Sequence, residues 1–156
     1  MTTINDKGFS LIELLIAISV VALTLVSISS GVSFAVKNSR FSQEKSVSVR
    51  YAQESLEWFR SNRDRLGWNA FYSILEDDSP GSFSYCLDSI PGDLQGFQDL
   101  QVYVAPANCQ IQTTMYTRLL EINLTDPSTV EVTSRVTWQD NSQTNETVLT
   151  TTLKQW

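Results

Sequence analysis

The chain has 156 residues, of which 42% are hydrophobic, and its formal net charge at pH 7 is −6. This length predicts one folded domain together with a membrane segment, and the repeats that build solenoids are absent. Because the chain contains no histidine, Ser-His-Asp and Cys-His catalysis and His-ligated metal sites are excluded. No other catalytic constellation is evident, so we expect a protein that is not an enzyme and that holds no cofactor or metal.

A polar leader, residues 1–8, precedes an apolar run that extends from Phe9 to Val36. The run is about 28 residues long, more than the about 20 that a helix needs to cross a bilayer core. We therefore expect residues 9–36 to form a transmembrane helix. The leader itself is too short and too polar to be a secretory signal with its own apolar core.

A single carboxylate, Glu13, lies near the start of this apolar run with no cation beside it in the sequence. A carboxylate inside a membrane helix costs about 2.5–3.5 kcal/mol on insertion scales, and such groups are usually paired and functional. One interpretation is that Glu13 lies at the interface or is protonated. The other is that a second chain supplies its partner, a free α-amino group created by a cut between Gly8 and Phe9.

The segment from Lys7 to Ala17, Lys-Gly-Phe-Ser-Leu-Ile-Glu-Leu-Leu-Ile-Ala, resembles the prepilin processing motif of type IV pilins and type II secretion pseudopilins. The resemblance implies cleavage after Gly8 by a prepilin peptidase in the cytoplasmic membrane and N-methylation of Phe9 by the same enzyme family. It also implies that Glu13 offsets the Phe9 amine of a neighbouring subunit during filament assembly. Many members of that family carry a proline in the membrane helix, where this chain has Ser29-Ser30-Gly31.

The helical pattern continues beyond the membrane run although the composition becomes polar. Apolar residues recur mostly at steps of three, four or seven, which predicts one helix from about Phe9 to about Arg65. The half over residues 37–66 is amphipathic. We expect its face bearing Trp58 and Phe59 to pack on the globular head.

Charge is unevenly distributed along the polar part of the chain. Residues 37–65 contain seven Lys and Arg against four Asp and Glu, whereas the residues from 66 onward contain three against eleven. A basic stalk therefore carries an acidic head, which should repel nucleic acid, and no direct nucleic-acid site is evident. The acidic residues match no calcium-binding loop, so we interpret them as solvated surface.

The globular head, residues 67–156, divides into two parts by its sequence pattern. Residues 67–99 are rich in turn sequences and are predicted to be irregular, apart from a short helical turn. Residues 100–156 change to a period of two, which predicts an antiparallel sheet of about four strands. The expected strands are Leu100–Val104, Tyr116–Leu124, Thr129–Trp138 and Thr147–Leu153. The fold class is α+β, and the family resemblance implies the type IV pilin fold, a long N-terminal helix packed on such a sheet.

Cys86 and Cys109 are the two cysteines of the chain, and both lie in the head. If the head lies outside the membrane, they can form one disulfide. Closing a loop of about 24 residues would stabilise the fold by roughly 3 kcal/mol in the chain-entropy model. The alternative is two unrelated buried thiols. A zinc site is not expected, because no close pair of cysteines exists.

Two classes of function remain open on the sequence. The first is a structural subunit of a type IV pilus, major or minor. Such a subunit joins other pilin subunits through its N-terminal helix, and assembly machinery in the cytoplasmic membrane polymerises them into a filament for adhesion, motility or DNA uptake. A type II secretion pseudopilin is the alternative within this class. The second is a membrane-anchored binding module of the cell envelope. For the first class we expect a single-pass inner-membrane protein with its amino terminus inside, which later becomes part of a surface fimbrium.

Overall fold

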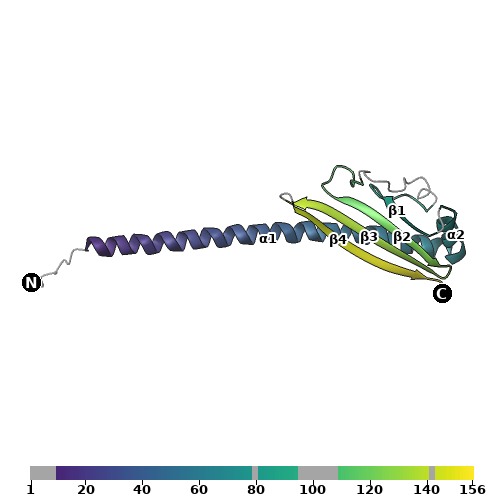
Figure 1. The fold of residues 1–156 in the computed structure, drawn as a ribbon, viewed down its shortest axis with the longest axis horizontal. Helices are drawn as coiled ribbons and strands as arrows, with labels where there is room; N and C mark the ends of the chain where they lie inside the picture. Colours follow the sequence, from purple (N-terminus) through teal and green to yellow (C-terminus); the bar gives the residue numbers. More distant parts are fainter. Residues whose placement is uncertain (1–9, 79–80, 95–108, 141–142) are drawn as a thin grey trace, which may run out of the picture. The chain divides into compact units, whose positions relative to one another are not determined.

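In a computed structural model of the chain, residues 10–78, 81–94, 109–140 and 143–156 are described. The chain divides into two compact units, residues up to Gln43 and residues Glu44–Trp156, and helix α1 contributes to both. The prediction of an α+β fold with a long N-terminal helix and a four-stranded antiparallel sheet is confirmed (Figure 1). The elements are α1 (Leu11–Leu66), α2 (Trp68–Asp78), β1 (Ser82–Cys86), β2 (Thr117–Asp126), β3 (Thr129–Asp140) and β4 (Gln143–Lys154).

Helix α1 is continuous from Leu11 to Leu66, including Ser29-Ser30-Gly31. It ends because Gly67 adopts a left-handed conformation with φ of 77°, and the Gly67 N–H donates to the Arg63 carbonyl at 2.9 Å. Glycine reaches this conformation without the steric cost that a Cβ would impose. The predicted end of the helix near Gly67 is therefore confirmed, while the predicted start at Phe9 lies outside the described residues.

The sheet has the strand order β1-β2-β3-β4, and every neighbouring pair is antiparallel. Pro127-Ser128 connects β2 to β3, as the sequence predicts. The predicted end of one strand at Trp138 and the predicted start of the next at Thr147 are wrong, because Asp140 pairs directly with Gln143 and both strands continue to that point. The polar ends of β3 and β4 form strand because each offers the other backbone hydrogen-bond partners, and this pairing outweighs the weak strand preference of the residues themselves.

The segment 67–99, predicted to be irregular apart from a short helical turn, contains a full helix of eleven residues, α2, and the edge strand β1, so the prediction of irregular structure is wrong. Along β1 the side chains of Phe83 and Tyr85 are buried, and they lie opposite Ile122 and Leu120 of β2. The predicted strand Leu100–Val104 lies outside the described residues. The other three predicted strands correspond to β2, β3 and β4 with shifted ends.

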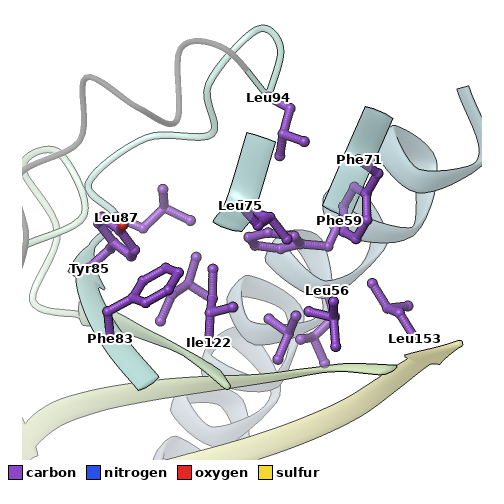
Figure 2. Close-up of a cluster of buried hydrophobic side chains, with 13 residues drawn as sticks. Leu56, Phe59, Phe71, Leu75, Phe83, Tyr85, Leu87, Leu94, Ile122 and Leu153 are labelled. Atoms are coloured by element: carbon purple, nitrogen blue, oxygen red, sulfur yellow. The ribbon is translucent and has the colours of Figure 1, made fainter. Parts of the chain in front are cut away.

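The core lies on one face of the sheet, where the second half of α1 and helix α2 pack against it (Figure 2). On β3, Val130, Val132, Val136 and Trp138 are all buried, as their shared parity predicts. Burying a large aliphatic or aromatic side chain contributes about 1.5–3 kcal/mol. The two helices contribute Leu56, Phe59, Phe71 and Leu75, and the sheet contributes Phe83, Tyr85, Leu120, Ile122, Val130, Val132 and Leu153.

Candidate functional site

The first unit presents a helix whose large hydrophobic side chains are exposed. From Leu11 to Val36, these side chains expose between 49% and 82% of their surface. A continuous apolar surface of this kind marks a membrane or protein interaction site. Of the helices in the described residues, α1 is the one long and apolar enough to cross a membrane. The expected surroundings of this surface are therefore lipid or other apolar helices.

Four of the hydroxyl groups along this apolar helix are satisfied within the helix. Those of Ser19, Ser27 and Ser33 donate to the carbonyl four residues earlier, at 2.8, 2.9 and 3.0 Å. The Thr24 hydroxyl donates to the Val21 carbonyl at 2.8 Å. An unsatisfied polar group in hydrocarbon costs several kcal/mol. These small side chains can therefore enter an apolar environment, and they allow other helices to approach closely.

Glu13 lies in the first turn of α1. The Ser10 carbonyl accepts hydrogen bonds from the N–H groups of Glu13 and Leu14, at 3.0 and 3.2 Å. The helix dipole favours a carboxylate at this end. Within the described part of the chain, no cationic side chain lies within ion-pair distance of Glu13. Gly8 and Phe9 lie outside the described residues, so their roles and the pairing of Glu13 stay predictions.

In the second unit, small side chains of α1 face the sheet. Ser48, Ala52 and Ser55 are fully buried. The Ser48 hydroxyl is hydrogen-bonded to that of Thr147 at 2.7 Å, and the Ser55 hydroxyl to that of Ser134 at 2.8 Å. Sequence reasoning singled out the large apolar residues of this half and missed this face. The signal was present as small residues at steps of four and three, the spacing of one helix face.

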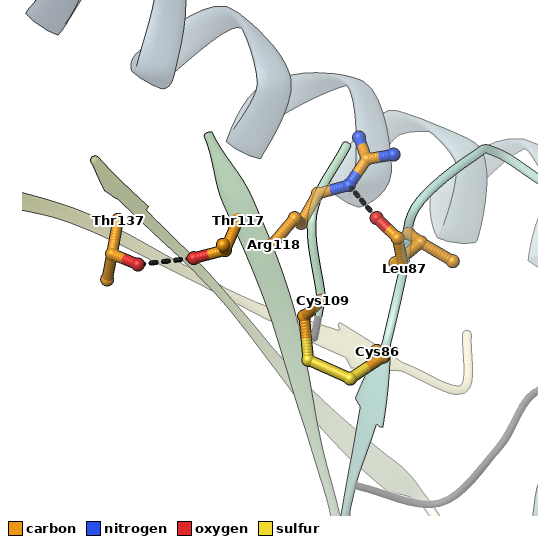
Figure 3. Close-up of a disulfide and its surroundings, with 6 residues drawn as sticks. All are labelled: Cys86, Leu87, Cys109, Thr117, Arg118 and Thr137. Carbon is orange, nitrogen blue, oxygen red and sulfur yellow. Dashed lines mark hydrogen bonds between the residues drawn. A yellow bond between two sulfur atoms is a disulfide. The ribbon is translucent and has the colours of Figure 1, made fainter. Parts of the chain in front are cut away.

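Arg118 of β2 lies on the same interface and is 1% exposed. Its Nε donates to the Leu87 carbonyl at 3.0 Å (Figure 3). Its Nη1 donates to the Tyr51 carbonyl at 3.1 Å and to the Glu54 carboxylate at 3.2 Å. Burial lowers the pKa of Arg118, and the charge of Glu54 opposes that shift. One guanidinium thus connects α1, β2 and the segment that follows β1.

Replacing Arg118 with methionine is expected to lower the free energy of unfolding of the second unit by about 2–4 kcal/mol, because two backbone carbonyls and the Glu54 carboxylate each lose a hydrogen bond from the guanidinium. The matched change Glu54→Gln should cost less than about 1 kcal/mol, since the Glu54 side chain is 53% exposed. Urea unfolding of the full chain followed by tryptophan fluorescence measures this, because all four tryptophans lie in the second unit. Equal losses for the two variants would contradict the role given to Arg118.

Cys86 and Cys109 form a disulfide, with their Cα atoms 4.7 Å apart (Figure 3). Cys86 is the last residue of β1, and Cys109 accepts a backbone hydrogen bond from the Arg118 N–H at 2.8 Å. The bond therefore ties the edge strand to a segment held by β2. A bridge of this kind persists in oxidising compartments.

A family model described as the prokaryotic N-terminal methylation motif matches residues 4–33. The matched range includes Gly8, Phe9 and Glu13 together with the first part of the apolar helix. No curated protein and no solved structure matches the chain. The comparisons therefore bear on the amino-terminal segment, and the chemistry of the head rests on its own structure.

Proposed function

We propose that this chain, whose residues 4–33 carry the signature of type IV prepilins and pseudopilins, is a structural subunit of a type IV pilus. The observation that carries the proposal is the continuity of this signature with a helix that exposes its apolar side chains. The arrangement of a long helix with a four-stranded sheet is typical of pilins and supports the proposal. The signature itself belongs to a structural family rather than to an enzyme family.

In the proposed pathway the precursor is anchored by the apolar half of α1, with its amino terminus in the cytoplasm. Prepilin peptidase cleaves after Gly8, and the new terminal residue Phe9 is N-methylated. The assembly machinery then moves the helix from lipid into a bundle of similar helices. The hydroxyl groups of Ser19, Thr24, Ser27 and Ser33 remain satisfied in both environments, because each already donates to a carbonyl of the same helix.

The pairing of charges would set the position of each subunit along the bundle. Glu13 lies four residues beyond Phe9 in the sequence. In the bundle, the Glu13 carboxylate accepts from the Phe9 amine of a neighbour. An unpaired charge buried among apolar helices is costly, so a subunit in the wrong register is penalised.

The mature protein from its native host is expected to begin at N-methylated Phe9, as measured by mass spectrometry of the intact chain. The change Gly8→Val should leave the leader attached, because a branched side chain replaces hydrogen at the cleaved bond. Thr3→Val, a change within the leader but away from the bond, is the matched control and should be processed normally. Assembled fibres that retain Met1 would overturn the processing step.

A pseudopilin of type II secretion carries the same signature, and the location of the assembled protein distinguishes the two. Shearing the cells releases surface filaments, and the fraction of the chain in that material is measured by immunoblot. A pilus subunit is expected in the sheared fraction, as a dominant band for a major pilin and a trace for a minor one. Its absence there, with the processed chain retained in the envelope, would overturn the pilus assignment in favour of a pseudopilin.

A further inference from the structure

Three segments of the second unit meet at the start of α2. The Trp68 indole N–H donates to the Pro127 carbonyl in the β2–β3 turn at 2.9 Å. The Gln155 backbone N–H, near the carboxyl terminus, donates to the Ser128 carbonyl of the same turn at 3.0 Å. A groove of about 370 Å³ opens between these segments. Its volume falls in the range of small-ligand sites.

Two aromatic side chains form one wall of this groove, which we call the aromatic groove. The rings of Trp68 and Tyr72 lie nearly parallel, with an interplanar angle of 27° and centroids 6.2 Å apart. The hydrogen bond from Trp68 to Pro127 fixes the orientation of the indole. The stacked pair therefore makes a preorganised aromatic platform at the groove.

Polar side chains surround the platform, and all of them are exposed: Asn69, Ser73, Glu76 and Gln155. Two carboxamides offer both donors and acceptors, and the carboxylate offers acceptors. The Ser73 hydroxyl donates to the Ala70 carbonyl at 3.1 Å, which leaves its oxygen available as an acceptor. The groove can thus make several hydrogen bonds to a ligand that carries neighbouring hydroxyl groups.

The charge of the aromatic groove narrows the class of ligand further. Glu76 is an acid, and none of the described residues that line the groove is Lys or Arg. Burial raises the pKa of the Tyr72 phenol, and the nearby charges of Glu76 and Asp126 raise it further. The charge carried by the described lining residues is therefore negative, which disfavours phosphates, sialic acids and uronic acids.

We propose that the aromatic groove binds a neutral sugar, with the C–H face of a pyranose ring on Trp68 and Tyr72 and its hydroxyls on the surrounding amides and carboxylate. An organic cation would also be attracted to aromatic faces and an acid. The parallel rings and the two carboxamide donors fit a flat, polyhydroxylated ligand better than a compact ammonium group. The inference goes beyond the proposed function, because the groove belongs to the second unit and does not depend on polymerisation.

The test uses the full chain in nanodiscs of phosphatidylethanolamine and phosphatidylglycerol, so that neither a sugar detergent nor a choline headgroup competes. Saturation-transfer NMR is recorded with the methyl glycosides of galactose, glucose, mannose and N-acetylglucosamine, and with choline as the cationic probe. We expect transfer to the ring protons of one face of at least one glycoside, at millimolar concentration. No transfer to any of the four, or transfer to choline alone, overturns the proposal.

Exposed groove residues give variants that leave the fold intact. Asn69→Ala and Gln155→Ala should each weaken binding about fivefold, the loss of one hydrogen bond. Gln139→Ala, which removes an exposed carboxamide of β3 outside the groove, is the matched control and should bind like the unaltered chain. Tyr72→Ala should abolish transfer. Unchanged binding by the double variant of Asn69 and Gln155 would show that the sugar binds elsewhere and would overturn the assignment.

Discussion

Replacing Glu13 with leucine is expected to leave membrane insertion intact and to reduce the yield of filaments at least about tenfold. Removing a carboxylate from an apolar helix relieves about 2.5–3.5 kcal/mol of insertion cost, so the membrane pool should not fall. In the filament, however, the Phe9 amine of a neighbour would lose its partner. Leaving one buried charge unpaired costs about 3–5 kcal/mol, which far exceeds the 1.4 kcal/mol of a tenfold change. Immunoblots of sheared filaments and of membranes measure the two pools separately.

Two controls isolate the charge of Glu13 from the general effect of altering α1. Glu57→Leu removes another carboxylate of the same helix, one whose side chain is 65% exposed and paired with Arg60. That variant should form filaments normally, because exposed ion pairs contribute little. Glu13→Asp keeps the charge and should retain most of the yield. Filaments at the unaltered yield from Glu13→Leu would exclude the charge pair and leave helix packing as the sole basis of assembly.

Replacing Phe59 with alanine is expected to lower the free energy of unfolding of the second unit by about 3–5 kcal/mol. The Phe59 side chain is fully buried, and its ring meets that of Phe71 of α2 edge-on, with centroids 6.5 Å apart. It therefore joins α1 and α2 within the core (Figure 2). A loss of this size is a large share of the about 5–15 kcal/mol that stabilises a typical domain. Urea unfolding of the full chain, followed by tryptophan fluorescence, gives the value.

Val148→Ala is the matched control for that experiment. The Val148 side chain is 41% exposed on the edge strand β4, so its truncation should change stability by less than about 0.5 kcal/mol. A similar small loss for Phe59→Ala would show that the core is not organised around this contact. If the tryptophan fluorescence of Phe59→Ala already differs from that of the unaltered chain before any urea is added, the loss of free energy of unfolding exceeds the upper end of the expected range.

The long helix and the strands at the end of the chain could be predicted from the sequence because their patterns are long and regular. Apolar residues repeat over many turns of α1, and Gly67 provides a recognisable end. On β3, alternate residues from Val130 to Trp138 face the core, with Ser134 as a polar member of the same row. Signals summed over ten or more residues outweigh local ambiguity.

The elements between helix and sheet were missed because their identity depends on contacts distant in sequence. Strand β1 has only five residues and is followed closely by Pro91-Gly92, a turn sequence. It forms strand because β2 offers it a free edge, where Phe83 and Tyr85 pair with apolar residues. Helix α2 buries Phe71 and Leu75, four residues apart, but it follows Gly67 and so could be mistaken for part of a loop.

The residues with a proposed function or a structural role also divide into those that the sequence predicts and those that it does not. Gly8, Phe9 and Glu13 lie within one short motif, so the sequence alone predicts their roles, and these roles stay predictions. The burial of Arg118 could not be foreseen, because its partners Tyr51 and Glu54 are more than sixty residues away along the chain. Arginine is also almost never fully buried unless it is paired, so the residue type by itself argues against the burial of Arg118.

The contact between α1 and the sheet has a mechanical consequence. Ser48, Tyr51 and Ser55 each join the helix to the sheet through a hydrogen bond, over about 10 Å of helix axis. A contact made of apolar side chains alone could slide by one helical turn at little cost in free energy, whereas here such a slip would break all three hydrogen bonds together. Tension applied along the helix is therefore resisted in shear, by several hydrogen bonds at once, and the sheet should stay fixed on the second half of α1 under load.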